Sequence, residues 1–328
     1  MVLGNQALDV PEERYLLGDR PPAQNSQHPP GPRRIVILAS SHAPAFEALD
    51  ALDRVVAVSR EHWFYSPAIR GRIERGEIVA LGSGETFDLE AVVALEADLV
   101  IGYPDIVPPP SRRRLERDFG IPVIYWWDYL EEHPLGRSEW ILAAGALLGY
   151  RTEARRVFEE IETDYLRIKA AAANQAAERD GGRDTARPRV LLNAPSGDVW
   201  PVPRSQSHSS VFVQDAGGVP ILQPEGIGAS LLDPEVVLQE ASEAEVWLNP
   251  GGARTLAELR ESVRLAPAFA AFRNGEVYGP VARISSTGAW DFFESGYLYA
   301  NRVLRDLALI LGPDPPKNGE LFYYRRLE

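Results

Sequence analysis

Aromatic side chains recur in this chain at the points where predicted strands end. Aromatic rings bind flat or bulky ligands by stacking, and each contact contributes about 0.5–1.5 kcal/mol. In open α/β sheets, ligands bind beyond the carboxyl ends of the strands. We therefore expect these rings to face one cleft, the alternative for any single ring being ordinary packing. The candidate ligand-binding aromatics are Trp63, Phe64, Tyr65, Tyr103, Trp126, Trp127, Trp200 and Trp290.

Three polar residues, Arg204, His208 and Asp291, complete the candidate ligand site. Arg204 and His208 stand in the segment P-R-S-Q-S-H, which follows Trp200, and Arg204 is the best candidate for a cation in the cleft. Asp291 and Glu294 come just before the last predicted helix, where an acidic residue either caps the helix or contacts a ligand. The alternative for Arg204 is a solvated loop position.

Catalytic and metal-binding motifs are missing from the sequence. Gly82-Ser83-Gly84 lacks the third glycine of a dinucleotide fingerprint, and no phosphate loop or G-x-S-x-G elbow occurs. The five histidines have no metal-ligand spacing, and there is no cysteine. We predict no catalytic residues, no metal site and no cofactor, and hence no enzyme. The alternative is a transferase or lyase that uses Asp291, Glu225 or His208 as acid–base groups in the same cleft.

The composition excludes several classes of protein. With 328 residues, 45% of them hydrophobic and 25% charged, the chain is long enough for two globular domains. A net charge of −13 argues against a general nucleic-acid binder, which needs clustered Lys and Arg. No apolar run is long enough to span a membrane. Because the N-terminus lacks the pattern of a signal peptide, the compartment must be inferred from function.

Strand and helix patterns alternate along most of the chain. The predicted strands are 34–38, 55–59, 78–81, 99–103 and 122–127, then 190–194, 246–249 and 277–279, with helices between them. This alternation predicts an α/β fold of two Rossmann-like lobes, each with a mostly parallel central sheet. We assign 1–33 to an extended N-terminal arm, 34–134 to the first lobe and 187–290 to the second. The remaining segment, 291–328, is expected to contain a C-terminal helix over 294–311 and a tail that adds an edge strand at 321–324.

A single long helix is expected to join the two lobes. The segment 135–180 reads as a short helix over 137–148 and a long one over 152–177, whose apolar residues recur every three or four positions. A charged linker follows at 179–187. The two lobes also share a repeated unit in which Asp88 and Asp233 each begin a helix that leads to a strand.

Five segments of the chain, taken together and in order, form a distinctive set. They are F-D-L-E-A-V-V-A-L-E-A-D-L-V-I (Phe87–Ile101), Y-L-E-E-H-P-L-G-R-S-E-W (Tyr129–Trp140), W-P-V-P-R-S-Q-S-H-S-S-V-F-V-Q-D-A-G-G (Trp200–Gly218), G-A-W-D-F-F-E-S-G (Gly288–Gly296) and Tyr323-Tyr324-Arg325. In these segments the chain resembles the helical-backbone substrate-binding proteins of ABC importers for cobalamin, ferric siderophores and haem. The resemblance covers about Arg34 to Leu327.

This resemblance implies a monomeric extracytoplasmic binding protein, anchored by a lipid, that carries a bulky metal chelate between its lobes to an ABC permease dimer. The acidic residues by which such proteins dock on permease arginines fall on Glu90 and Glu235, which the repeat also pairs. The tryptophans that clamp cobalamin in some members are replaced by Gly84 and about Ala229, whereas the acidic residue before their last helix matches Asp291. The ligand class stays open among ferric siderophore, corrinoid and haem. A receptor-docking sensor is a further alternative.

Overall fold

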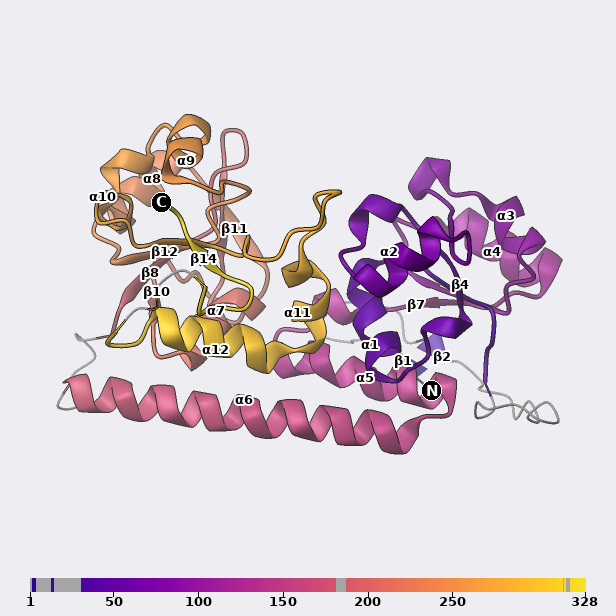
Figure 1. Ribbon diagram of the computed structural model, residues 1–328. Coiled ribbons are helices and arrows are strands. Elements are labelled where there is room, and N and C mark those ends of the chain that lie inside the picture. The colour runs from indigo at the N-terminus through magenta and orange to yellow at the C-terminus, as the bar shows by residue number, and fades with distance from the viewer. Residues whose placement is uncertain (1, 4–12, 15–30, 181–186, 315, 317–318) are drawn as a thin grey trace. The chain divides into compact units, whose positions relative to one another are not determined.

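The computed structural model describes residues 2–3, 13–14, 31–180, 187–314, 316 and 319–328 (Figure 1). The chain divides into two compact units. Unit 1 contains the described residues of Met1–Glu131, Gly136–Glu160 and Ile284–Leu298, and unit 2 those of Glu132–Leu135, Ile161–Arg283 and Tyr299–Glu328. Most of the predicted arm and linker lies outside the described residues. Only a short antiparallel pair, β1 (Val2–Leu3) with β2 (Glu13–Arg14), is described in the arm before residue 31.

Unit 1 is built on a five-stranded parallel sheet in the order β5-β4-β3-β6-β7. Apolar β-branched residues dominate these strands because both faces are covered, and β3, β4, β6 and β7 are fully buried. The predicted parallel sheet is thus confirmed. The strands are β3 (Ile35–Ile37), β4 (Val55–Val58), β5 (Val79–Ala80), β6 (Leu99–Gly102) and β7 (Val123–Tyr125).

Helices follow each strand of this sheet. Leu89 and Val92 of α3 and Leu115 of α4 pack with Val36 and Val100 in one buried cluster. Gly120 ends α4 in the left-handed conformation that favours glycine. The helices are α1 (Ala43–Ala48), α2 (Pro67–Glu74), α3 (Leu89–Ala94) and α4 (Pro109–Phe119).

Two helices follow one another where the chain passes from unit 1 to unit 2, and the second of them crosses the boundary at Glu160–Ile161. They are α5 (Pro134–Leu148) and α6 (Arg151–Asp180), as the apolar spacing predicted. Helix α6 contains 30 residues, and Figure 1 shows it as one continuous helix. One stripe of α6 is buried, because its apolar residues recur at three- and four-residue intervals. The buried residues of this stripe are Ala154, Val157, Ile161, Tyr165, Ile168 and Ala172. None of the helices in the described part of the chain is both long and apolar enough to cross a membrane.

Unit 2 contains a second five-stranded sheet, in the order β10-β8-β12-β13-β14, which differs from the strand order of unit 1. Its strands are parallel except at the edge, where β14 (Arg325–Arg326) pairs antiparallel with β13. The tail therefore adds an edge strand, but at Arg325–Arg326 instead of 321–324. The other strands are β8 (Arg189–Leu192), β10 (Val219–Pro220), β12 (Val246–Leu248) and β13 (Val277–Gly279).

A separate two-stranded antiparallel ribbon in unit 2 was not predicted. It pairs β9 (Trp200–Pro203) with β11 (Ala229–Leu232), so Trp200 lies in a strand and not in a loop. The helices of unit 2 are α7 (His208–Asp215), α8 (Pro234–Ala241), α9 (Leu256–Ser262), α10 (Ala270–Arg273) and α12 (Ala300–Ile310).

The predicted helix over 294–311 is interrupted. A short helix α11 (Ser295–Leu298) belongs to unit 1, and α12 belongs to unit 2. Tyr299 separates them with φ −95° and ψ 60°, outside the helical region. The break therefore coincides with the boundary between the units.

Candidate functional site

The carboxyl ends of three strands of unit 1 carry a hydrogen-bonded cluster. Tyr103 follows β6, and its hydroxyl donates to Asp128 Oδ1, which follows β7, at 2.6 Å. The Tyr103 hydroxyl also lies 2.8 Å from Ser41 Oγ, after β3. His42 is buried beside them, its ring 4.9 Å from that of Tyr103 in an edge contact. Strand ends thus gather these side chains on unit 1, as the sheet geometry predicts.

Burial governs the charges in this cluster. It raises the pKa of Asp128 to about 6, against the hydrogen bond from Tyr103, and lowers the pKa of His42 to about 3. Burial, with Asp128 nearby, also raises the pKa of the Tyr103 phenol well above its ordinary value. Tyr103 is therefore a neutral phenol whose hydroxyl donates a hydrogen bond to Asp128.

An aromatic residue and a cation are paired after strand β4. Trp63 is 37% exposed, and the guanidinium carbon of Arg60 lies 5.3 Å from the centre of its ring. Arg60 is held in place because its Nε donates to Ser83 Oγ at 2.8 Å. Tyr65, two residues after Trp63, is half-buried. This pair offers a ligand both an aromatic surface and positive charge.

A second aromatic pair lies on the segment Ile284–Leu298. Trp290 and Phe293 stack with ring centres 5.4 Å apart and an interplanar angle of 24°. Phe293 is 51% exposed, so the pair presents an open aromatic surface. Trp290 remains a candidate for ligand binding, and Phe293 joins it.

Several candidate ligand residues turn out to be core residues. Phe64, Trp126 and Trp200 are 0%, 2% and 0% exposed, so these rings are almost entirely covered by other residues, although Trp126 borders a small cavity in unit 1. Trp126 packs on His42 and Trp140 in unit 1, whereas Trp200 packs on Trp247 and Phe269 in unit 2. For these three rings the packing alternative is correct. Asp291 is only 3% exposed. Trp127 is half-buried and packs against the core of unit 1.

Arg204 and His208 lie in unit 2, together with Glu225 of the enzyme alternative. The guanidinium of Arg204 donates to the backbone carbonyl of Glu225 at 3.2 Å, which holds the loop after β9 to the loop before β11. The ring of His208 makes an edge contact with Phe212 at 4.7 Å. Asp291 belongs to unit 1, so the three proposed acid–base groups are not assembled within one unit.

Sequence reasoning missed three residues beside the predicted set. Arg60 was overlooked because it precedes Trp63 in a loop without a motif. Arg137 lies 4.4 Å from the centre of the Tyr297 ring and, with Asp128, lines a small cavity in unit 1. Tyr129 is 39% exposed and packs edge-on against Tyr103 at 4.9 Å. The aromatic segment around 126–129 carried a signal for Tyr129, whereas neither arginine had one.

The two predicted docking residues occupy equivalent positions. Asp88 caps α3 by accepting the N–H of Ala91, and Asp233 caps α8 by accepting the N–H of Glu235. Glu90 and Glu235 therefore both lie in the first turn of a capped helix, and both are exposed. The side chain of Glu90 is 88% exposed, with Arg114 at 4.0 Å.

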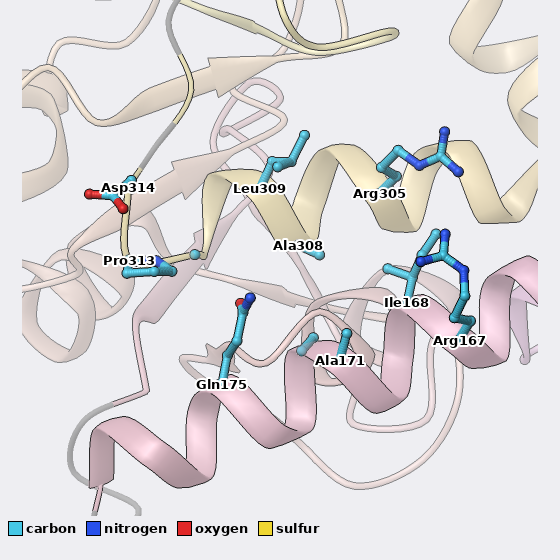
Figure 2. Close-up of a pocket in the computed structure, with 11 residues that line it drawn as sticks. Arg167, Ile168, Ala171, Gln175, Arg305, Ala308, Leu309, Pro313 and Asp314 are labelled. Atoms are coloured by element: carbon cyan, nitrogen blue, oxygen red, sulfur yellow. The ribbon is translucent and has the colours of Figure 1, made fainter.

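A pocket in unit 2 is lined by none of the predicted ligand residues. It has a volume of about 280 Å³ and lies between α6 and α12, with Ile168, Ala171 and Leu309 among its lining residues (Figure 2). Arg167 and Arg305 at one end both donate to Asp164. Within the described ranges, no group of three or more His, Asp or Glu side chains is arranged to hold a metal ion.

Comparison with known proteins places the sequence in a family. The sequence profile of the family described as periplasmic binding protein matches residues 35–280. An uncharacterized lipoprotein of Methanocaldococcus jannaschii is 22% identical in an alignment of 301 positions that covers 89% of this chain and 68% of that protein. A binding-protein family and a lipoprotein relative both indicate an extracytoplasmic location.

Solved structures share the fold at low sequence identity. A periplasmic heme-binding protein from Pseudomonas aeruginosa superimposes with a TM-score of 0.63 at 19% identity, covering 87% of this chain and 94% of that one. An ABC-type Fe3+-hydroxamate transport system structure from Saccharomonospora viridis gives a TM-score of 0.61 at 19% identity, covering 86% and 94%. These likenesses support the two-lobed α/β fold.

Proposed function

This chain belongs to the periplasmic binding protein family, and from that premise we propose that it captures a bulky metal chelate and delivers it to an ABC transporter permease. The chelate is a ferric siderophore, a corrinoid or haem. The observation that carries this proposal is the Arg60–Trp63 pair at the end of β4. An exposed indole with a fixed guanidinium matches a ligand that is broad, apolar and negatively charged at its edge.

Further residues support the same ligand chemistry. Tyr129 and the Trp290–Phe293 pair add exposed aromatic surface on unit 1, and Arg137 adds positive charge. The names of the two compared structures refer to heme and to Fe3+-hydroxamate, which are both iron chelates. The family consists of binding proteins, which favours capture and delivery over the transferase or lyase alternative. With a lipoprotein among its relatives, we propose a lipid anchor at the outer face of the membrane.

Tryptophan fluorescence tests the ligand. We expect saturable quenching at sub-micromolar concentration when the protein is titrated with one of haem, cobalamin, cobinamide or a ferric siderophore, because Trp63 and Trp290 would lie beside an absorbing chelate. Trp63→Ala should weaken that binding about tenfold, the effect of losing roughly 1.4 kcal/mol. If a folded protein responds to none of these compounds, the chelate proposal is wrong.

Delivery to a permease is tested at Glu90 and Glu235. We expect Glu90→Ala with Glu235→Ala to reduce docking on the cognate transporter, reconstituted in lipid nanodiscs, by roughly tenfold to a hundredfold, since charged rim residues guide orientation and association. The loss should shrink as salt rises. Glu240→Ala and Glu96→Ala, two exposed acids on the same segments, are matched controls. Docking that survives the double substitution unchanged at low salt argues for a different partner.

A further inference from the structure

The segment Ile284–Leu298 belongs to unit 1, although the residues on both sides of it belong to unit 2. Side-chain contacts must therefore hold it on unit 1. Near its start, Arg70 of α2 donates to Ser286 Oγ at 2.7 Å. Near its end, the guanidinium of Arg137 covers the ring of Tyr297 at 4.4 Å. Between these contacts lies Glu294.

Glu294 makes a bidentate contact with the turn that precedes α2. Its Oε2 accepts the backbone N–H of Tyr65 at 2.7 Å, and its Oε1 accepts the backbone N–H of Ser66 at 2.8 Å. Glu294 is 2% exposed, so water does not compete for these bonds. The sequence suggested that Glu294 either caps the final helix or contacts a ligand. Its carboxylate binds the backbone of Tyr65 and Ser66 instead of capping that helix. Two short N–H bonds to one buried carboxylate are the arrangement that stabilises its ionised form.

The surroundings of Glu294 oppose its charge. Burial is the main cause that raises its pKa to about 8, and the carboxylates of Glu47 on α1 and Asp291 act in the same direction. The N–H groups of Tyr65 and Ser66 act the other way. Ser66 Oγ in turn donates to Glu47, which ties the second acid to the same turn. The charged form of Glu294 thus depends on this turn.

Glu294 directly follows the aromatic pair of the segment. Trp290 and Phe293 stack on each other, and Phe293 adjoins Glu294 in the chain. We propose that Glu294 is a positioning residue that fastens Ile284–Leu298 to the turn before α2 and so sets the Trp290–Phe293 pair in place for the ligand. The ligand part of this proposal rests on the proposed function, whereas the fastening does not.

The test is ¹⁹F NMR of protein labelled with 5-fluorotryptophan. The chain has seven tryptophans, and Trp290→Phe identifies the resonance of Trp290. In Glu294→Ala we expect that resonance to shift or broaden, while those of Trp200 and Trp247 in unit 2 stay in place. Glu294→Gln keeps one oxygen acceptor and should give a smaller change. Affinity for the chelate identified by quenching should fall about tenfold in Glu294→Ala, because the Trp290–Phe293 pair is no longer held in place to stack on it.

The controls separate the two parts of the proposal. Glu74→Ala removes an exposed acid from α2 and should change neither readout. An unmoved Trp290 resonance in Glu294→Ala overturns the fastening, whatever the ligand is. A moved resonance with unchanged affinity keeps the fastening and overturns the ligand part. If Glu294→Ala fails to fold, Glu294→Gln alone decides, because its shape is that of the native residue.

Discussion

Replacing Trp200 by alanine is expected to lower the free energy of unfolding of unit 2 by about 3–5 kcal/mol. The indole is 0% exposed, and its Nε1 donates to the carbonyl of Leu192 at 2.9 Å. Its ring centre lies 5.7 Å from that of Trp247 and 5.6 Å from that of Phe269. Truncation of Trp200 therefore leaves a cavity and removes two aromatic contacts. It also removes the hydrogen bond that the indole donates to the buried carbonyl of Leu192.

Urea denaturation followed by circular dichroism measures this loss, and Trp63→Ala is the matched control. Trp63 is 37% exposed, so its removal should change stability by no more than about 0.5–1 kcal/mol. The two variants should therefore have different defects. Trp200→Ala should lower the stability of the fold, whereas Trp63→Ala should lower the affinity for the chelate. A Trp200→Ala protein as stable as the parent would show that the indole is not part of the core. Trp200 would then again be a candidate for ligand binding.

Trp200 also shows where sequence reasoning fails. Pro201 and Pro203 on either side of Val202 indicate a loop, because proline cannot donate to a strand ladder. In the structure, Trp200–Pro203 forms a strand that pairs with β11. Along a strand, the backbone N–H groups of alternate residues point to the same side, so Pro201 and Pro203 occupy positions on one side. The N–H of Arg204 points to the opposite side and donates to the carbonyl of Gly228 at 2.9 Å. The two proline positions therefore do not have to donate a hydrogen bond to β11. This depends on the pairing register of the two strands and cannot be deduced from composition.

Local patterns predicted the elements whose cause is local. The apolar stripe of α6 is set by three- and four-residue spacing within the helix itself, and the caps at Asp88 and Asp233 each bind an N–H no more than three residues away. The structure confirms both predictions. The parallel sheet of unit 1 was predictable for a similar reason, since burial of both faces requires continuous apolar strands.

The break at Tyr299 and the role of Glu294 could not be predicted in this way. No Gly or Pro marks Tyr299, and the apolar spacing continues across it, so propensity favours one uninterrupted helix. The hydrogen bonds of Glu294 reach Tyr65 and Ser66, more than 200 residues away in the chain. Phe64 and Trp126 were misjudged for the same reason. Whether a ring after a strand is buried depends on partners that only the tertiary fold supplies.

His42 is expected to make the stability of unit 1 depend on pH in a defined window. Its ring is fully buried, and neither ring nitrogen has a hydrogen-bond partner among the described residues. Nε2 lies 3.9 Å from Asp128 Oδ1, too far for a hydrogen bond that would hold a proton. Burial lowers the pKa of His42 from 6.5 to about 3.

The sign follows from proton binding. Between about pH 6.5 and 3 the unfolded chain binds a proton at this position that the folded chain does not, so acid favours unfolding. The contribution of neutral His42 is therefore complete above pH 6.5 and is lost as the pH falls. At pH 5 the loss amounts to roughly 2 kcal/mol by linkage. The raised pKa of Asp128 acts in the opposite direction between 3.8 and about 6, so the wild-type curve alone does not isolate His42.

A His42→Phe variant isolates it, because phenylalanine keeps an aromatic ring beside Tyr103 and Trp126 but has no proton to bind. We expect the difference in unfolding free energy between variant and parent to change by about 2 kcal/mol in favour of the variant from pH 7.5 to pH 5. Asp128 is present in both proteins, so most of its effect cancels in that difference. A difference that stays constant across this range would mean that His42 binds its proton in the folded protein. The Asp128 carboxylate, 3.9 Å away, would then be the group that holds it.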